Sequence, residues 1–214
     1  MAAGVSLIAL IPAKGLAAAK SRLAPAFSPA ERAEVSRHML RSLLSQVMQL
    51  AELDACAVIS AGEQALEEAR QAGAMPLPEA TAGLNKALEA GRAWAVGQGA
   101  SSLLVILSDL PLASLEDLRE LLSRRGQAPV VLAPSKDGGT NALLLTPPEA
   151  IPFRFGRDSA RYHCFEAERH GLPVALVERD GLAFDVDTPE DLRAYRAVQA
   201  GRLQLSQTLA PAAR

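Results

Sequence analysis

Residues 103–111, LLVILSDLP, are the stretch that decides the fold of this chain. Its first five residues are all apolar, which is typical of a short strand buried on both faces of a sheet. Ser108 and Asp109 follow at once, and Pro111 stiffens the exit from the strand. Because open α/β sheets bind their ligands beyond the carboxyl ends of the strands, Asp109 is the first candidate for chemistry.

Strands and helices alternate on both sides of this stretch, as they do in a sheet covered by helices on both faces. The predicted strands cover residues 5–11, 55–60, 103–107, 129–133, 142–145 and 174–177. The predicted helices cover residues 29–50, 63–71, 85–96, a segment that begins after residue 114, 159–170 and 189–200. Capping patterns mark three helix starts, at Ser28, Ser114 and Thr188. We therefore predict an α/β fold with a mixed, mostly parallel sheet, one domain over residues 1–200 and a flexible tail over 201–214.

The composition indicates one ordinary globular domain. The chain has 214 residues, 49% of them apolar, against a domain size of roughly 150 residues. Its 22 basic residues nearly balance its 24 acidic ones, so it lacks the positive field that drives nucleic-acid binding. The apolar start breaks at Pro12 and Lys14, too early for a signal peptide or a membrane span. We expect a cytoplasmic protein with no nucleic-acid or membrane partner, and the sequence leaves open whether it forms a homodimer.

A basic loop follows the first predicted strand. Residues 12–22 read PAKGLAAAKSR and contain Lys14, Lys20 and Arg22. The loop matches neither the glycine pattern of dinucleotide-binding proteins nor that of P-loop enzymes, which argues against both classes. Three cations at a strand end suit a triphosphate through charge-assisted hydrogen bonds. A solvated basic loop is the alternative when the segment is taken alone.

A pair of aspartates precedes the last predicted helix in the segment FDVDTP, residues 184–189. In an extended chain Asp185 and Asp187 project to the same face. Two carboxylates held side by side are unfavourable unless a cation lies between them, so the pair favours a metal site together with Asp109. The alternatives are that Asp187 belongs to a helix cap and that Asp109 is an ordinary turn residue.

Two further segments offer backbone N–H groups and a hydroxyl to an anion. They are GGTN at residues 138–141 and FGRDS at residues 155–159, the second at a helix start. A small phosphorylated acid could bind between them, whereas a simple turn and a helix cap are the alternative interpretation. The three histidines lie on helical segments with no matched serine or cysteine nucleophile, and for them we expect surface or packing roles.

Six motifs, taken together and in order, make the chain similar to the 2-phospho-L-lactate guanylyltransferase family of deazaflavin coenzyme F-420 biosynthesis. They run from about Ile8 to Leu192 and read IPAKGLAAAKSRL, GLNKAL, SDLPL, DGGTNAL, FGRDS and FDVDTPEDL. The family also includes enzymes that use phosphoenolpyruvate or 3-phospho-D-glycerate. The resemblance implies a single-domain, Rossmann-like nucleotidyltransferase fold of the GT-A/MobA-like type that uses GTP and Mg2+.

The resemblance also implies a role for each matching residue. The carboxylates that would hold Mg2+, as two ions, are those of Asp109, Asp185 and Asp187. The cations that would grip the triphosphate are Lys14, Lys20 and Arg22, and the residues implied to be catalytic are Lys14, Lys20 and Asp109. The residue implied to lie near the guanine is Asn85. The residues implied to surround the acceptor acid are Thr140, Gly156 and Ser159, with Asp158 at a position where the family often has a small residue.

This resemblance implies transfer of GMP from GTP to the phosphate of the acid, with release of pyrophosphate. The second pKa of a phosphate monoester lies near ~6, so the attacking oxygen is already ionised at neutral pH and no general base is needed. One rival is another nucleotidyltransferase of the same fold, for example the molybdenum-cofactor type, which usually has a glycine-rich first loop that is absent here. A second rival is a nucleotide-binding module without turnover. The sequence does not choose among the three acceptor acids.

Overall fold

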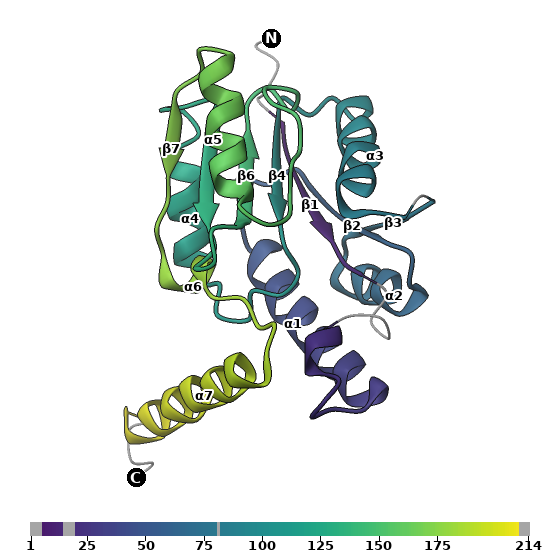
Figure 1. The fold of residues 1–214 in the computed structure, drawn as a ribbon, viewed down its shortest axis with the longest axis vertical. Coiled ribbons are helices and arrows are strands. Elements are labelled where there is room, and N and C mark those ends of the chain that lie inside the picture. Colours follow the sequence, from purple (N-terminus) through teal and green to yellow (C-terminus); the bar gives the residue numbers. More distant parts are fainter. Residues whose placement is uncertain (1–5, 15–19, 81, 210–214) are drawn as a thin grey trace.

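The structure is a computed structural model that describes residues 6–14, 20–80 and 82–209. Val5, part of the first predicted strand, lies outside this range, as do residues 15–19 of the basic loop and 210–214 of the predicted tail. Seven strands form one sheet in the order β3-β2-β1-β4-β6-β5-β7 (Figure 1). The strands are β1 (Leu7–Pro12), β2 (Ala55–Ser60), β3 (Met75–Pro78), β4 (Ser102–Ile106), β5 (Val130–Pro134), β6 (Thr140–Leu145) and β7 (Val174–Leu176).

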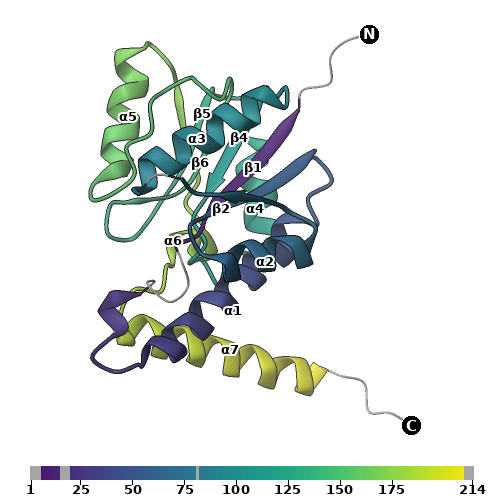
Figure 2. The same ribbon diagram turned by 90° about the vertical axis from the view of Figure 1, so that its right-hand side faces the viewer.

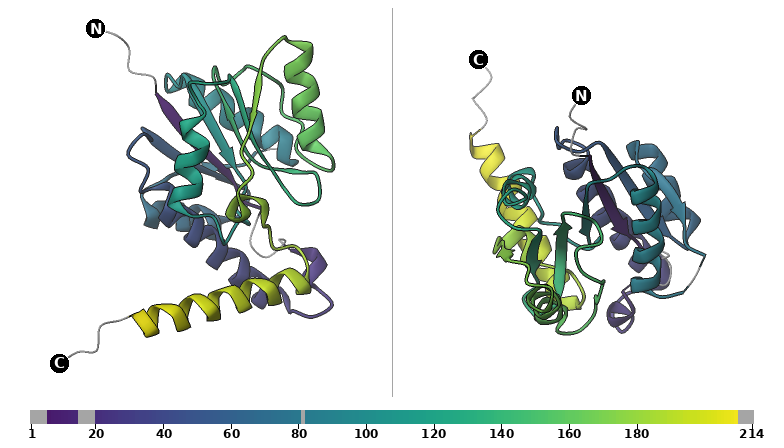
Figure 3. Two further views of the ribbon diagram at one scale, coloured as in Figure 1. Left: turned by 90° about the vertical axis from the view of Figure 1, so that its left-hand side faces the viewer. Right: turned by 90° about the horizontal axis from the view of Figure 1, so that it is seen from above.

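Helices cover both faces of the sheet (Figures 2 and 3). The larger helices are α1 (Pro29–Val47), α2 (Glu63–Ala72), α3 (Leu84–Gly97), α4 (Leu115–Ser123), α5 (Ser159–Arg169) and α7 (Pro189–Leu209). Two short elements complete the set, a 3-10 turn at Ser21–Leu23 and α6 (Asp180–Ala183). Side chains of α1, α2 and α4 pack in one apolar cluster and those of α3 and α5 in the other, so the molecule has three layers.

The alternation of side chains along β1 explains the two clusters. Leu7, Ala9 and Ile11 contribute to the cluster with α1, whereas Ile8 and Leu10 contribute to the cluster with α3. All five side chains are at most 2% exposed, as expected for the centre of a sheet covered on both sides.

The packing of α3 against β1 depends on one glycine. A Cβ atom at Gly91 would lie 2.4 Å from a methyl carbon of Leu10, which is closer than two carbons can approach. The glycine therefore lets this helix lie close to the central strand.

The predicted mixed and mostly parallel sheet is confirmed. Among the described strands only β6 runs against its neighbours, β4 and β5, while the other pairs are parallel. Three elements were not predicted: the 3-10 turn, β3 and the four-residue α6. The sequence of β3, MPLP, contains two prolines, which lack the N–H that a central strand needs. An edge position, where β3 pairs with β2 alone, accommodates them.

The last helix lies at the end of the molecule toward which the parallel strands run (Figures 1 and 2). Val186, Leu192 and Tyr195 pack with Met39 of α1 in a small third cluster. α7 continues to Leu209, so the predicted end at about residue 200 was too early. None of the described helices is long and apolar enough to cross a membrane.

Candidate active site

A cleft of about 480 Å³ opens at the carboxyl ends of the parallel strands. Its walls include the first residues after β1, β3 and β4 and the start of α3. The polar residues that line it are Lys14, Lys20, Arg22, Ser36, Glu79, Ser108, Asp109 and Asp187. The predicted basic loop and the predicted acidic strand end therefore meet in one cavity, as the sheet topology requires.

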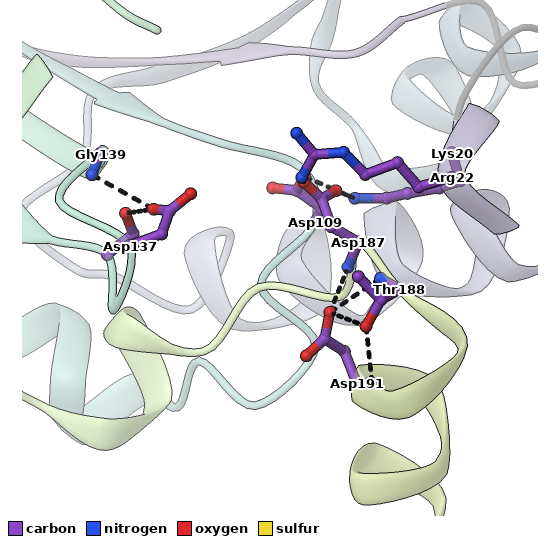
Figure 4. A network of polar contacts seen from close by, with 9 residues as sticks. Lys20, Arg22, Asp109, Asp137, Gly139, Asp187, Thr188 and Asp191 are labelled. Carbon is purple, nitrogen blue, oxygen red and sulfur yellow. Dashed lines mark hydrogen bonds and ion pairs between the residues drawn. The ribbon is translucent and has the colours of Figure 1, made fainter. Parts of the chain in front are cut away.

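The centre of the charged end is the ammonium group of Lys20 (Figure 4). It lies 2.6 Å from Asp109 Oδ2 and 2.8 Å from Asp187 Oδ1, and the Lys20 side chain is 7% exposed. Arg22 Nη1 adds a longer contact of 3.4 Å to Asp187 Oδ2. Burial disfavours the ammonium, but the two carboxylates outweigh it and raise the pKa of Lys20. Residues that are far apart in the chain thus form one ion-paired group.

Asp185 faces the same group without a cation of its own among the described residues. Burial, followed by repulsion from Asp109, raises the pKa of the Asp185 carboxyl to about 6. Asp187 and Asp137 add smaller repulsions of the same sign. Asp109 and Asp187 therefore share Lys20, Asp185 lies near enough to be repelled by both, and more negative charge gathers here than Lys20 and Arg22 neutralise locally.

The cap of α7 fixes the loop that carries Asp185 and Asp187. Asp191 Oδ2 accepts hydrogen bonds from the backbone N–H groups of Asp187 at 3.1 Å and Thr188 at 2.8 Å. Thr188 Oγ1 in turn accepts from the N–H of Asp191 at 3.2 Å, which completes the predicted capping pattern. A further bond from Val186 N–H to the carbonyl of Asp109, 3.3 Å long, joins this loop to the end of β4.

A fourth aspartate faces the charged end from the turn between β5 and β6. Asp137 Oδ1 accepts hydrogen bonds from the Ser135 hydroxyl and from the Gly139 N–H, the latter at 3.2 Å (Figure 4). These bonds, with a smaller contribution from the charge of Arg22, lower the pKa of Asp137. Asp137 was not among the predicted site residues, because its electrostatic interaction with Arg22 depends on how the two loops fold together.

The donor set of the charged end fits a hard divalent cation. The second carboxylate oxygen of Asp109, Oδ1, is buried and has no hydrogen-bond partner among the described residues. Carboxylate oxygens are the ligands that Mg2+ prefers, and an unpartnered buried one is unfavourable unless a cation meets it. No group of three or more acidic, histidine or cysteine side chains in the described parts of the chain is already arranged around a metal position. Lys20 instead stands between two of the oxygen donors.

Two residues predicted to surround the acceptor, Thr140 and Ser159, lie together but are buried. Ser159 Oγ donates to Thr140 Oγ1 at 3.1 Å, and Thr140 Oγ1 lies 3.0 Å from His163 Nδ1. Because His163 Nε2 accepts the N–H of Arg154 at 3.1 Å, the proton of the neutral ring is on Nδ1 and points to Thr140. Burial, followed by the charge of Arg92, lowers the pKa of His163 to about 4 and keeps the ring neutral. Both hydroxyls are thus used inside the protein, and the packing role expected for this histidine is confirmed.

Asn85, predicted to lie near the guanine, holds another segment in place. Its Oδ1 accepts the N–H of Phe155 at 2.8 Å and its Nδ2 donates to the carbonyl of Phe155 at 3.0 Å. The amide is therefore occupied on both sides, and Asn85 does not line the cleft. Gly156 follows directly with φ near +139°, a backbone conformation that favours glycine. Contact of Asn85 with guanine and of Gly156 with the acceptor stays a prediction.

The sequence is similar to those of proteins with named activities. Residues 7–196 match the family described as guanylyl transferase CofC like. The phosphoenolpyruvate guanylyltransferase of Rubrobacter xylanophilus is 43% identical over 195 residues, which cover 90% of this chain and 95% of that protein. The 2-phospho-L-lactate guanylyltransferase of Methanothermobacter thermautotrophicus is 37% identical, covering 86% and 81%. The 3-phospho-D-glycerate guanylyltransferase of Colwellia psychrerythraea is 34% identical, covering 86% and 88%.

Solved structures share the fold at low sequence identity. A protein from Desulfovibrio desulfuricans that is described as a nucleotide-diphospho-sugar transferase superposes with a TM-score of 0.73 at 20% identity. The match covers 88% of this chain and 85% of that one. A CMP:2-keto-3-deoxy-manno-octonic acid synthetase complexed with CTP superposes with a TM-score of 0.63 at 13% identity, covering 92% and 99%. The predicted nucleotidyltransferase fold is thereby confirmed. The chain belongs to the CofC-like guanylyl transferase family.

Proposed function

We propose that this protein is a Mg2+-dependent guanylyltransferase that transfers GMP from GTP to the phosphate of a small phosphorylated carboxylic acid. The observation that carries the proposal is the group formed by Lys20, Asp109 and Asp187 at the floor of the cleft. Family membership supports the guanylyl group, and the relatives' names supply the candidate acids: phosphoenolpyruvate, 2-phospho-L-lactate and 3-phospho-D-glycerate.

The work required of the protein is to align two anions that repel each other. Lys14 lies at the exposed edge of the cleft and Lys20 and Arg22 at its charged end, so together they would hold the triphosphate. An acid whose phosphate is already ionised would attack the α-phosphorus, forming a new P–O bond as the bond to pyrophosphate breaks. No described side chain needs to remove a proton from it.

The carboxylates that would hold Mg2+ are those of Asp109, Asp185 and Asp187. When bound, the metal supplies positive charge next to the α-phosphate, where negative charge builds up during transfer. The ammonium of Lys20 now lies between Asp109 and Asp187, and it would be available to the phosphates if Mg2+ held those two carboxylates.

Pyrophosphate release tests the proposal directly. The purified protein is incubated with GTP, Mg2+ and each of the three acids in turn, and the product is identified by mass spectrometry as guanosine joined to the acid through a diphosphate. We expect one acid to give the highest kcat/KM and a chelator to abolish turnover. No pyrophosphate with any of the three acids would reject the proposal.

A further inference from the structure

The cleft has a second end that the proposed chemistry does not use. Glu79, Gly83, Leu84, Ala87 and Ile59 line it. Glu79 follows β3 at the edge of the sheet, whereas Asp109 follows β4, three strands away. Neighbouring strands are about 4.8 Å apart, so the ends of these two strands are separated by roughly 14 Å across the sheet. A nucleotide with its phosphates at the charged end would extend its base toward this second end.

The second end combines apolar walls with one carboxylate. Ile59 and Ala87 are buried and Leu84 is half-buried, so the walls suit a flat ring. Glu79 is half-buried, and its backbone is fixed by a hydrogen bond of 2.8 Å from its N–H to the carbonyl of Ser60. Within the described residues, no donor forms a hydrogen bond or ion pair with the Glu79 carboxylate. A half-buried carboxylate that no described residue engages, beside apolar walls, is available to a ligand with its own donors.

We propose that Glu79 recognises guanine by accepting hydrogen bonds from N1–H and the exocyclic N2 amine. This inference rests on the proposed function and names the residue that makes it specific for GTP. Two adjacent donors on guanine match the two oxygens of one carboxylate. The assignment replaces Asn85, whose amide is bound on both sides to Phe155.

The start of α3 completes the match. Gly83 is the N-cap of this helix and makes no side-chain cap, so backbone N–H groups at the helix start have no side-chain acceptor there. Gly83 and Leu84 line the same end of the cleft as Glu79. These N–H groups suit O6 of guanine, which accepts hydrogen bonds. Adenine presents the opposite pattern, with an amine in place of O6 and an acceptor in place of N1–H, so it meets like against like.

Changing Glu79 and the purine base of the nucleotide together tests the proposal. In Glu79→Gln one carboxylate oxygen becomes an amide NH2, which repels the N2 amine of guanine but can donate to the O2 carbonyl of xanthine. We expect kcat/KM for GTP to fall about 10- to 100-fold, the effect of one hydrogen bond to a charged group, and kcat/KM for xanthosine triphosphate to rise. The Kd of each nucleotide with Mg2+, measured by calorimetry without acceptor, should change in the same direction.

The matched control is Glu52→Gln, which makes the same change at an exposed residue outside the cleft and should leave both nucleotides unaffected. Inosine triphosphate provides a test on the unaltered protein, since it lacks the N2 amine, and it should be at least about 10-fold poorer than GTP. Equal use of inosine and guanosine triphosphates, or an unchanged preference in Glu79→Gln, would overturn the role of Glu79 while leaving the transferase intact. A protein that neither binds nor consumes any guanine nucleotide would instead overturn the proposed function itself.

Discussion

Two polar groups of this molecule differ in how far their members satisfy one another. At the end of β4, Asp109 and Asp187 share one ammonium group, Asp109 Oδ1 has no partner within the described part of the chain and the pKa of Asp185 is raised. At the start of β6, Thr140, Ser159 and His163 satisfy one another inside the protein. The first group opens into the cleft and the second does not.

The difference between the two groups shows which polar residues are available for chemistry. A hydrogen-bonded buried network stabilises the fold and has little left to offer a ligand, whereas unbalanced charge and unpartnered oxygens persist only where something else completes them. The sequence presented both groups as candidate ligand sites. The structure distinguishes them by their partners, and substitutions in each group should therefore affect different measurements.

The largest expected effect comes from the unbalanced group. Asp109→Asn keeps the shape of the side chain but removes a charge that would hold the metal, and we expect turnover to fall on the order of 10²-fold or more. Pyrophosphate release measures it, with circular dichroism to show that the fold survives. Asp180→Asn, at an exposed residue of α6, is the matched control and should be nearly as active as the unaltered protein. Asp187→Asn should behave like Asp109→Asn, and near-normal activity in both would refute the metal assignment.

Substitutions in the hydrogen-bonded group of Thr140, Ser159 and His163 should instead lower the free energy of unfolding. Thr140→Val preserves the shape of the side chain but leaves the Nδ1–H of His163 without its acceptor, a loss of about 1–3 kcal/mol in the free energy of unfolding. Denaturant unfolding measures this loss, and kcat/KM at a temperature where the variant is folded should change by less than about 10-fold. If the variant were as stable as the original protein but as inactive as Asp109→Asn, Thr140 would belong to the acceptor site and the comparison would fail.

Sequence patterns predicted the features that depend on neighbouring residues. The capping box at Ser28, the cap at Thr188 and the apolar run of β4 each follow from a few adjacent side chains, and the structure confirms all three. The mostly parallel sheet also followed from the alternation of strands and helices. The sequence missed β3 because its two prolines argue against a strand, and only its edge position makes them acceptable.

The site was predictable only in part, because whether a polar side chain finds a hydrogen-bond partner depends on how distant segments pack together. Asp109, Asp185 and Asp187 could be grouped from strand ends; in the structure Asp109 and Asp187 share Lys20, and Asp185 is close enough to be repelled by both. Nothing in the local sequence indicated that the amide of Asn85 would be taken up by Phe155, 70 positions along the chain. Glu79 was overlooked for a related reason, since it follows the strand that was not predicted.

The pH dependence of stability provides a second test of the unbalanced group, through Asp185. The raised pKa of Asp185, about 6, means that the folded protein holds this proton more tightly than the unfolded chain does. Stability is therefore undiminished below about pH 4, where both states are protonated, and is lost as pH rises through about 6. Asp185→Asn should raise the free energy of unfolding at pH 7.5 by on the order of 1 kcal/mol, allowing for solvent screening, and change it little at pH 4. Denaturant unfolding at the two pH values, without Mg2+, checks this, and an equal gain at both would show that the buried charge of Asp185 is not the cause.

The smallest expected effect on stability concerns Asp158, the N-cap residue of α5. It is exposed, precedes α5 with φ near +55° and makes no cap hydrogen bond, and its Oδ1 would lie 3.6 Å from a Cβ atom placed on Gly138. Asp158→Gly relieves the strain of the left-handed backbone in the folded protein but raises the conformational entropy of the unfolded chain. These two effects oppose each other, so the free energy of unfolding should change by less than about 0.5 kcal/mol. Asp158→Asn removes the charge alone and tolerates the same backbone, which makes it the matched partner.

If the β5–β6 turn and the start of α5 border the acceptor, both variants should lower KM for the phosphorylated acid and leave KM for GTP unchanged, because a negative charge beside an anion is lost. A lower KM in Asp158→Gly but not in Asp158→Asn would assign the effect to the backbone, and no change in either would place the acceptor away from this turn.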